Sequence, residues 1–145
     1  MRGYWNNPGE TTNALRDGWL HTGDIGKLDE DGYLYLLDRK KDMIIVNASN
    51  VYAPEVEEVL GKHPSIREAA IIGTPLPNEG EEVTAVVTLH PEFELTLEAV
   101  RHYCHDRLAS FKIPTRLEIV TSLPRTTVGK LNKTALRQQY TPILL

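Results

Sequence analysis

Hydrophobic residues recur along this 145-residue chain with two different spacings, and the change between them marks the predicted elements. The segment 43–52 opens on the apolar run Met-Ile-Ile-Val, which predicts a strand that runs into a polar loop. Two further apolar runs, 67–75 and 81–90, predict a pair of strands separated by a turn over 76–81. The segment 116–120 predicts one more short strand.

Helices are predicted where apolar residues fall three or four positions apart. The first, 54–63, starts at Pro54, whose fixed φ suits a first helical turn, and stops before Pro64. A second helix is predicted over 97–110, and a short terminal helix over 133–140. The apolar face of the second helix carries Leu97, Val100, Cys104 and Leu108.

The part of the chain before residue 42 has a different character. Residues 1–23 are rich in Asn, Gly, Thr and charge, have little periodicity, and do not look like an independent folding unit. Residues 24–39 place two short apolar runs around Asp-Glu-Asp-Gly, where Gly32 tolerates a positive φ, and predict a β-hairpin. From about residue 42 the predicted order is strand, helix, two strands, helix, strand, loop, helix. This order indicates a small α+β domain with helices packed on one sheet.

Composition and charge exclude several classes of function. The net charge of −4 gives no electrostatic case for nucleic-acid binding, and no run of Lys or Arg indicates an anionic membrane surface. No apolar stretch approaches the length of a bilayer span, so no transmembrane segment is expected, and the N-terminus lacks the hydrophobic core of a signal peptide. We therefore expect a soluble, cytoplasmic protein.

The single cysteine, Cys104, cannot form an intrachain disulfide, which fits a reducing compartment. Together with His102 and His105 it could form a metal site. However, these three side chains point to different faces of the predicted helix, and no second pair of ligands occurs elsewhere in the sequence. The sequence therefore favours a buried cysteine and no metal.

The segment Pro-Arg-Thr-Thr-Val-Gly-Lys, 124–130, ends in a Gly-Lys pair of the kind that binds phosphate. A Walker A loop is excluded, because Pro124 and Leu131 stand where that loop needs a glycine and a Ser or Thr. What remains is a proline-stiffened loop in which Gly129 frees the backbone so that Lys130 can be held out from the surface. From the residues alone, a solvated lysine in a turn is the favoured alternative.

Six segments, taken together, resemble the C-terminal end of the acyl-CoA synthetases, members of the adenylate-forming superfamily that includes luciferases and peptide-synthetase adenylation domains. They follow one another in the family's order and at compatible spacings over almost the whole chain. The segments are MRGYWNNPGETT, DGWLHTGDIG, DEDGYLYLLDRKKDMII, NVYAPEVEEVL, HPSIREAAIIGTP and LPRTTVGKLNKTALR.

The resemblance implies an activity and assigns residues to it. In the family a carboxylate attacks the α-phosphate of ATP, with magnesium, to give an acyl adenylate and pyrophosphate, and the thiol of coenzyme A then displaces AMP. Lys130 matches the catalytic lysine, which would stabilise the negative charge that develops at the α-phosphate. Asp24 matches the residue that binds the ribose hydroxyls of ATP, and Arg39 matches a second nucleotide contact. Without the resemblance, Asp24 would be interpreted as an ordinary turn or hairpin-edge aspartate and Arg39 as a solvated charge.

The resemblance also implies a division of the chain. Residues 1–40 would be the tail of a large ATP-binding domain, and residues 41–145 a mobile lid. Lys41 occupies the place of the family's hinge, although the charged segment 38–42 alone would indicate only a solvated turn. The phosphate loop, the acyl pocket and most of the adenine site belong to the large N-terminal domain, which is missing from this sequence. We therefore expect a fragment that binds no cofactor tightly and does not catalyse alone.

One departure from the family concerns the path of coenzyme A. Asn47 and Ala48 occupy the positions of a glycine pair that borders the pantetheine path, and Ser49 stands where a glutamate or an aromatic residue is common. Side chains at these positions narrow the path. The leading hypothesis is the lid of a carboxylate:CoA ligase, with a fatty acid as the expected carboxylate. The alternatives are the lid of an adenylation domain that loads a carrier protein, and a stand-alone interaction module without catalysis.

Overall fold

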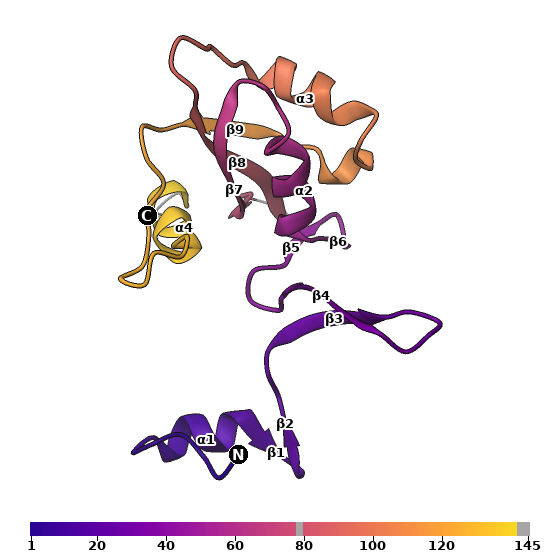
Figure 1. Ribbon diagram of the computed structural model, residues 1–145, viewed down its shortest axis with the longest axis vertical. Helices are drawn as coiled ribbons and strands as arrows, with labels where there is room; N and C mark the ends of the chain where they lie inside the picture. Colours follow the sequence, from indigo (N-terminus) through magenta and orange to yellow (C-terminus); the bar gives the residue numbers. More distant parts are fainter. Residues whose placement is uncertain (78–79, 142–145) are drawn as a thin grey trace. The chain divides into compact units, whose positions relative to one another are not determined.

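The computed structural model of the chain describes residues 1–77 and 80–141 (Figure 1). Its residue contacts divide the chain into two compact units, Met1–Lys41 and Asp42–Leu145. The turn predicted over 76–81 includes Asn78 and Glu79, which lie outside the described residues. None of the helices in the described ranges has the length and apolar character that crossing a membrane requires.

The first unit consists of one short helix and two small antiparallel pairs of strands. Its elements are α1 (Pro8–Ala14), β1 (Leu15–Arg16), β2 (Trp19–Leu20), β3 (Asp24–Leu28) and β4 (Leu34–Arg39). Helix α1 was not predicted. The side chain of Asn7 caps it by accepting a hydrogen bond from the backbone of Glu10 at 3.1 Å. The helix buries no side chain, so its sequence carries no apolar periodicity that could reveal it.

The predicted β-hairpin over 24–39 is confirmed by strands β3 and β4, which pair antiparallel. In its turn, the Asp29 carboxylate accepts hydrogen bonds from the backbone N–H groups of Asp31 at 3.1 Å and Tyr33 at 2.8 Å. Gly32 adopts a φ of +84°, the left-handed conformation expected for it. The pairing shifts register between Ile25 and Gly26, so the residues of the two strands are not paired one to one along the whole hairpin.

The first unit has no hydrophobic core of its own. No side chain in residues 1–41 is buried, and several large apolar ones are widely exposed, among them Trp5 at 97%, Trp19 at 74% and Leu36 at 70%. A segment that buries so little apolar surface cannot offset the conformational entropy that folding removes. This agrees with the expectation that residues 1–23 do not fold as an independent unit.

The second unit is built on a three-stranded sheet. Strands β7 (Ile66–Pro75) and β8 (Glu81–Leu89) pair antiparallel, and β9 (Arg116–Ile119) pairs parallel to β8. Around this sheet lie β5 (Ile44–Val46), β6 (Ser49–Val51), α2 (Ala53–Leu60), α3 (Leu97–His105), a 3₁₀ helix (Ser110–Lys112) and α4 (Lys133–Tyr140). These elements confirm the predicted α+β class.

Helices cover both faces of the central sheet, where the sequence predicted only that they pack on one sheet. One face packs against α2 and α3, and the other packs against Leu136 of α4 and against Leu123, which precedes that helix. Figure 1 shows α4, in yellow, on one side of the sheet and α2 with α3 on the other. Neighbouring residues of a strand point to opposite faces, so both sides of β7 and β8 are apolar. The first face contributes Ile71, Val83, Ala85 and Val87, and the second contributes Ala70, Ile72 and Val86.

The prediction of a single strand running into a loop over 43–52 is wrong. The segment forms a second hairpin in which β5 pairs with β6, and only Asn47 and Ala48 connect the strands. Both residues have positive φ values, +47° and +61°, as a type I′ turn requires. The sequence did not reveal this turn because Asn-Ala lacks the glycine that usually marks it.

The prediction of a helix over 97–110 is wrong at its C-terminal end. Helix α3 ends at His105, and the backbone N–H of Leu108 turns back to the carbonyl of Cys104 at 2.9 Å. This turn lets Leu108 stay in the core at 8% exposure although it is outside the helix. Cys104 is fully buried on the apolar face, as expected, and this burial raises the pKa of its thiol.

Replacing Ala48 by glycine is expected to raise the free energy of unfolding by about 0.5–1 kcal/mol. A left-handed φ costs a residue with a Cβ about 1–2 kcal/mol, and glycine removes this cost. Glycine also makes the unfolded chain more flexible, which favours unfolding and cancels part of the stabilisation. Urea unfolding followed by circular dichroism measures the change. Ala109→Gly is the matched control, because Ala109 is exposed with a φ of −62° and glycine should destabilise the protein there. A similar loss in both variants would contradict the strain assigned to Ala48.

Candidate functional site

Asp24 and Arg39, predicted as nucleotide contacts, lie together in the first unit. Asp24 begins β3 and Arg39 ends β4, and the hairpin register makes them cross-strand partners. The Nε atom of Arg39 is 3.3 Å from Oδ1 of Asp24, with the Arg39 side chain 63% exposed and that of Asp24 30% exposed. An exposed pair of this kind adds less than about 1 kcal/mol to stability. The arrangement therefore presents a carboxylate and a guanidinium side by side to the solvent.

The backbone around this pair forms a concave surface. The N–H of Asp24 donates to the hydroxyl of Thr22 at 3.1 Å, and the N–H of Lys40 donates to the carbonyl of Gly23 at 2.8 Å. These bonds hold the segment before β3 against the end of β4. The shallow hollow that results is lined by Thr22, Gly23, Arg39, Lys40 and Lys41. The carboxylate of Asp24, which lines a neighbouring hollow with Arg39, could accept two hydrogen bonds from a ligand. Together with the cations of this surface it suits a ligand with neighbouring hydroxyls and negative charge.

The predicted loop over 124–130 is a tight turn in the second unit. The N–H of Thr126 donates to the carbonyl of Lys130 at 2.7 Å, and the N–H of Gly129 donates to the carbonyl of Thr126 at 2.9 Å. The N–H of Lys130 also donates to the hydroxyl of Thr126 at 3.2 Å. Gly129 has a φ of +82°, a left-handed conformation that glycine adopts without the strain a side chain would cause.

Two anchors fix the ends of this turn. Before it, Leu123 is 5% exposed and belongs to the core between the sheet and α4. After it, the side chain of Asn132 caps α4 by accepting a hydrogen bond from the N–H of Ala135 at 3.1 Å. Between the anchors, Lys130 is exposed, and none of the described residues of its own unit accepts a hydrogen bond or an ion pair from its Nζ atom. The turn thus presents the ammonium group of Lys130 to the solvent from a packed base.

Residues 47–49, predicted to border the path of coenzyme A, form the turn between β5 and β6 and the first residue of β6. Asn47 and Ala48 are exposed, and Ser49 is half-buried. The turn retains the left-handed conformation that a glycine pair adopts easily. The departure from the family pattern therefore adds side chains to the turn while its backbone keeps a glycine-like shape.

The three residues weighed as metal ligands do not come together. Cys104 is fully buried, whereas His102 and His105 are exposed, and His105 contacts Asp106 with 2.8 Å between its Nδ1 atom and the carboxylate. The part of the chain that the structure describes contains no group of three or more His, Cys, Asp or Glu side chains that could hold a metal ion.

Comparison with known proteins assigns the class of this chain. Residues 55–130 match the family described as the AMP-binding enzyme C-terminal domain, and the match ends at Lys130. More than half of the chain is covered, and the chain belongs to this family. The matched residues include the central sheet, most of α2, all of α3 and the turn that carries Lys130.

Individual relatives cover nearly the whole chain. A long-chain-fatty-acid–CoA ligase of Bacillus subtilis is 44% identical over 141 residues, which are 97% of this chain and 25% of the relative. The long-chain-fatty-acid–CoA ligase FadD13 of Mycobacterium tuberculosis is 41% identical over 97% of this chain and 28% of its own length. This chain therefore spans about a quarter of the length of the curated relatives it matches.

Solved structures have the same fold over the same range. ATP-bound MatB from Rhodopseudomonas palustris gives a TM-score of 0.88 at 39% identity, with 99% of this chain and 29% of that chain covered. The amide bond synthetase McbA from Marinactinospora thermotolerans gives a TM-score of 0.85 at 44% identity, with 98% of this chain and 29% of that chain covered.

Replacing Gly129 by valine is expected to lower the free energy of unfolding by about 1–2 kcal/mol, and Gly129→Asn by clearly less. No atom lies within 4 Å of a Cβ built at Gly129, so the penalty comes from the positive φ alone. Asparagine tolerates that φ, whereas a β-branched residue does not. Chemical unfolding of both variants measures the difference, with Val128→Ala as a control at a residue that is 77% exposed. Equal effects of Val and Asn would show that the turn does not require the left-handed conformation.

Proposed function

We propose that this chain is the C-terminal part of an AMP-forming carboxylate:CoA ligase in which Lys130 promotes formation of the acyl adenylate. The observation that carries the proposal is the exposed Lys130 at the end of the family segment, held out by a tight turn between two anchors. A fatty acid is the proposed carboxylate, because relatives at 41–44% identity are named long-chain-fatty-acid–CoA ligases. The expected cytoplasmic location stays a prediction.

The proposed reaction has two steps. A carboxylate oxygen forms a bond to the α-phosphorus of ATP, and the bond from that phosphorus to the pyrophosphate oxygen breaks. In the second step the sulfur of coenzyme A attacks the acyl carbon, and AMP leaves with the oxygen that linked it to the acyl group. Lys130 acts in the first step, where its ammonium group stabilises the negative charge that develops around the α-phosphorus.

The nucleotide would also contact the first unit. We assign the ribose hydroxyls of ATP to the Asp24 carboxylate and a second contact to Arg39. The support is that the two side chains lie 3.3 Å apart, both reach the solvent, and a hollow adjoins them. Magnesium would bind with the triphosphate, whose site we assign to the large domain.

The two steps need two arrangements of the lid, and Lys41 is the proposed hinge. Its support is that the boundary between the two compact units falls directly after Lys41. Hinges lie at the ends of elements, where φ and ψ change without breaking a packed core. In the second arrangement the turn of residues 47–49 would border coenzyme A.

We propose that residues 1–40 are the tail of a large ATP-binding domain, which covers them in the full-length protein. These residues bury no side chain of their own and leave Trp19, Leu34 and Leu36 widely exposed, as expected for a segment that another domain covers. Without that domain the chain would lack the triphosphate site, so it would not catalyse alone. Loading of a carrier protein and a non-catalytic role have less support, because curated relatives at 41–44% identity are named CoA ligases.

Lys130→Ala in the full-length ligase is expected to slow acyl-adenylate formation on the order of a hundredfold or more, since losing a charged transition-state contact costs about 3 kcal/mol. Thioester formation from preformed acyl adenylate should change far less. ATP–pyrophosphate exchange and single-turnover thioester formation measure the two steps separately. Lys62→Ala, which removes an exposed lysine outside the turn, is the control. Equal losses in both steps would refute the role of Lys130.

Lys41→Pro in the same ligase should have the opposite effect, with adenylation retained and thioester formation impaired. Proline fixes φ near −65°, so a hinge that must adopt two backbone conformations is held in one. The acyl adenylate should then accumulate while pyrophosphate is released. Lys41→Ala, which removes the charge and leaves the backbone free, should keep both steps. Parallel changes in both steps of a folded proline variant would exclude Lys41 as the hinge.

A further inference from the structure

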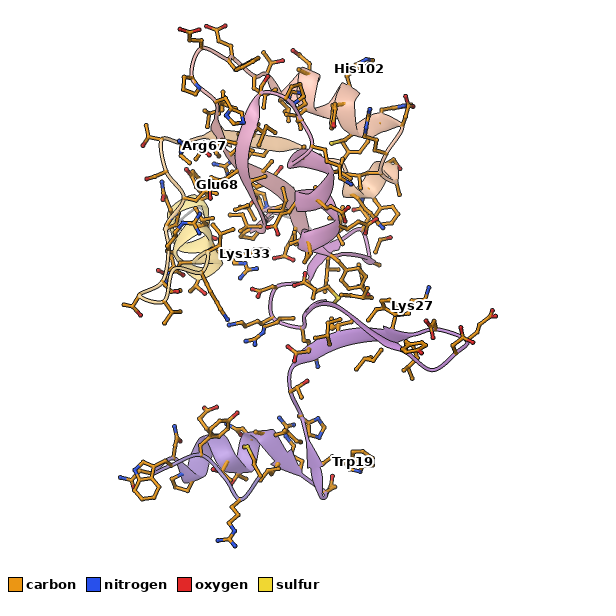
Figure 2. All side chains as sticks on the ribbon, in the orientation of Figure 1. Trp19, Lys27, Arg67, Glu68, His102 and Lys133 are labelled. Atoms are coloured by element: carbon orange, nitrogen blue, oxygen red, sulfur yellow. The ribbon has the colours of Figure 1, made fainter. Side chains whose placement is uncertain are left out.

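A single guanidinium connects the turn of Lys130 to the central sheet. Nη1 of Arg125 donates a hydrogen bond to the carbonyl of Gly129 at 3.0 Å, and Nη2 of the same side chain pairs with the carboxylate of Glu68. Gly129 directly precedes Lys130, and Glu68 belongs to β7. Figure 2 labels Glu68 on the sheet beside the C-terminal segment that carries the turn.

This bridge does something that the other contacts of the turn do not. The hydrogen bonds between Thr126, Gly129 and Lys130 lie within the turn, so they set its shape. Leu123 and Leu131 pack against the core beneath α4, and the N–H of Asn132 donates to the carbonyl of Pro124 at 2.8 Å, so these contacts fix the base of the turn. Among the described residues, the pair of Arg125 and Glu68 is the one ion pair that joins the turn to the sheet. It therefore restrains the far side of the turn, next to Lys130, which the contacts at the base do not reach.

The bridge requires a guanidinium. Arginine presents its N–H groups in a rigid fork, so one side chain can hold a carboxylate and a carbonyl at the same time. A lysine has one nitrogen at the end of a flexible stem and would favour one partner over the other. The pair is also partly solvated, with Arg125 46% and Glu68 37% exposed, so it contributes little to stability.

We propose that Arg125 and Glu68 are positioning residues that orient Lys130 for adenylation, an inference that rests on the proposed role of Lys130. They do not touch the reacting atoms. They act through the backbone carbonyl of Gly129, one residue before the catalytic ammonium group. A shift of about 1 Å in a reacting group can slow a reaction on the order of a hundredfold, so a weak surface pair can have a large effect on rate.

The first test uses the 145-residue chain and does not depend on activity. Glu68→Gln keeps the shape of the side chain and removes its charge. Backbone hydrogen exchange, measured by NMR, should become several-fold faster at Thr126 and Gly129, while helix α4 and the global stability stay unchanged. The control is Glu58→Gln, which removes the carboxylate of an exposed ion pair with Lys62 and should leave the turn unaffected. Unchanged exchange in the turn would overturn the proposal.

The second test uses the full-length ligase. Glu68→Gln and Arg125→Lys should each lower kcat for ATP–pyrophosphate exchange by about tenfold to a hundredfold, with the KM for ATP nearly unchanged and thioester formation from preformed acyl adenylate retained. The double variant should fall little further, because both changes break one bridge. Full adenylation activity with a loosened turn, or equal losses in both steps, would overturn the proposal.

Exchanging the charges of residues 68 and 125 distinguishes an effect of the bridge to Gly129 from an effect of the ion pair alone. Glu68→Arg combined with Arg125→Glu restores an ion pair, but a glutamate at 125 cannot donate to the carbonyl of Gly129. The exchanged variant should therefore stay slow, and recovery of the full rate would overturn the bridge. If the wild-type ligase shows no pyrophosphate exchange with any carboxylate, the proposed function fails, and the hydrogen-exchange measurement still decides whether Glu68 holds the turn.

Discussion

Burial of the β7–β8 pair on both faces is the constraint from which the second unit is built. Ile71 and Val87 face the core beneath α2 and α3, while Ala70 and Val86 face the core beneath α4. Neither face of the sheet can be left open without exposing a row of apolar side chains to water. Helices must therefore cover both sides, and the chain has to cross from one side of the sheet to the other after β9.

That crossing places the turn of Lys130. The chain leaves β9, enters the second core at Leu123, and returns through α4, whose Leu136 is 1% exposed. Helix α4 is fixed further by two largely buried ion pairs. Lys133 contacts Glu57 of α2 at 2.8 Å, and Arg137 contacts Asp42 at 2.8 Å. A helix held in this way provides a firm base for the turn, so the exposed side chain of Lys130 starts from a backbone that is fixed by packing.

The elements that were predicted correctly are those marked by a pattern of a few neighbouring residues. The Asp-Glu-Asp-Gly turn, the apolar runs of β7 and β8, and the proline at the start of α2 each act over a few residues, and each was confirmed. Helix α1 could not be predicted from the sequence because it buries no side chain and so has no apolar periodicity. The β5–β6 turn could not be predicted because Ala48 adopts a positive φ that glycine usually provides. The end of α3 depends on how Leu108 reaches the core, which periodicity alone does not determine.

In the candidate site, too, single residues could be proposed from the sequence, whereas the contacts between them could not. Asp24, Arg39 and Lys130 are proposed as site residues by resemblance to a family, because each lies within a recognisable motif. The pairing of Asp24 with Arg39 depends on the register of the hairpin, including the shift between Ile25 and Gly26. The bridge from Glu68 to Arg125 spans 57 positions of the sequence and depends on how α4 and its preceding turn pack on the sheet. Contacts of that kind follow from the fold and have no local signal.

The two units differ in what they need to keep their structure, and this difference bears on the proposed motion. Residues 42–141 enclose two apolar cores across the central sheet, so this unit can keep its internal contacts while it rotates as a body. Residues 1–41 bury no side chain, so their arrangement has to be stabilised by other surfaces. A change of φ or ψ at Lys41 would disturb neither core, because the first core residue after it is Ile44. The boundary at Lys41 is therefore a place where the backbone can rotate without breaking the contacts that hold Lys130 and its turn in the second unit.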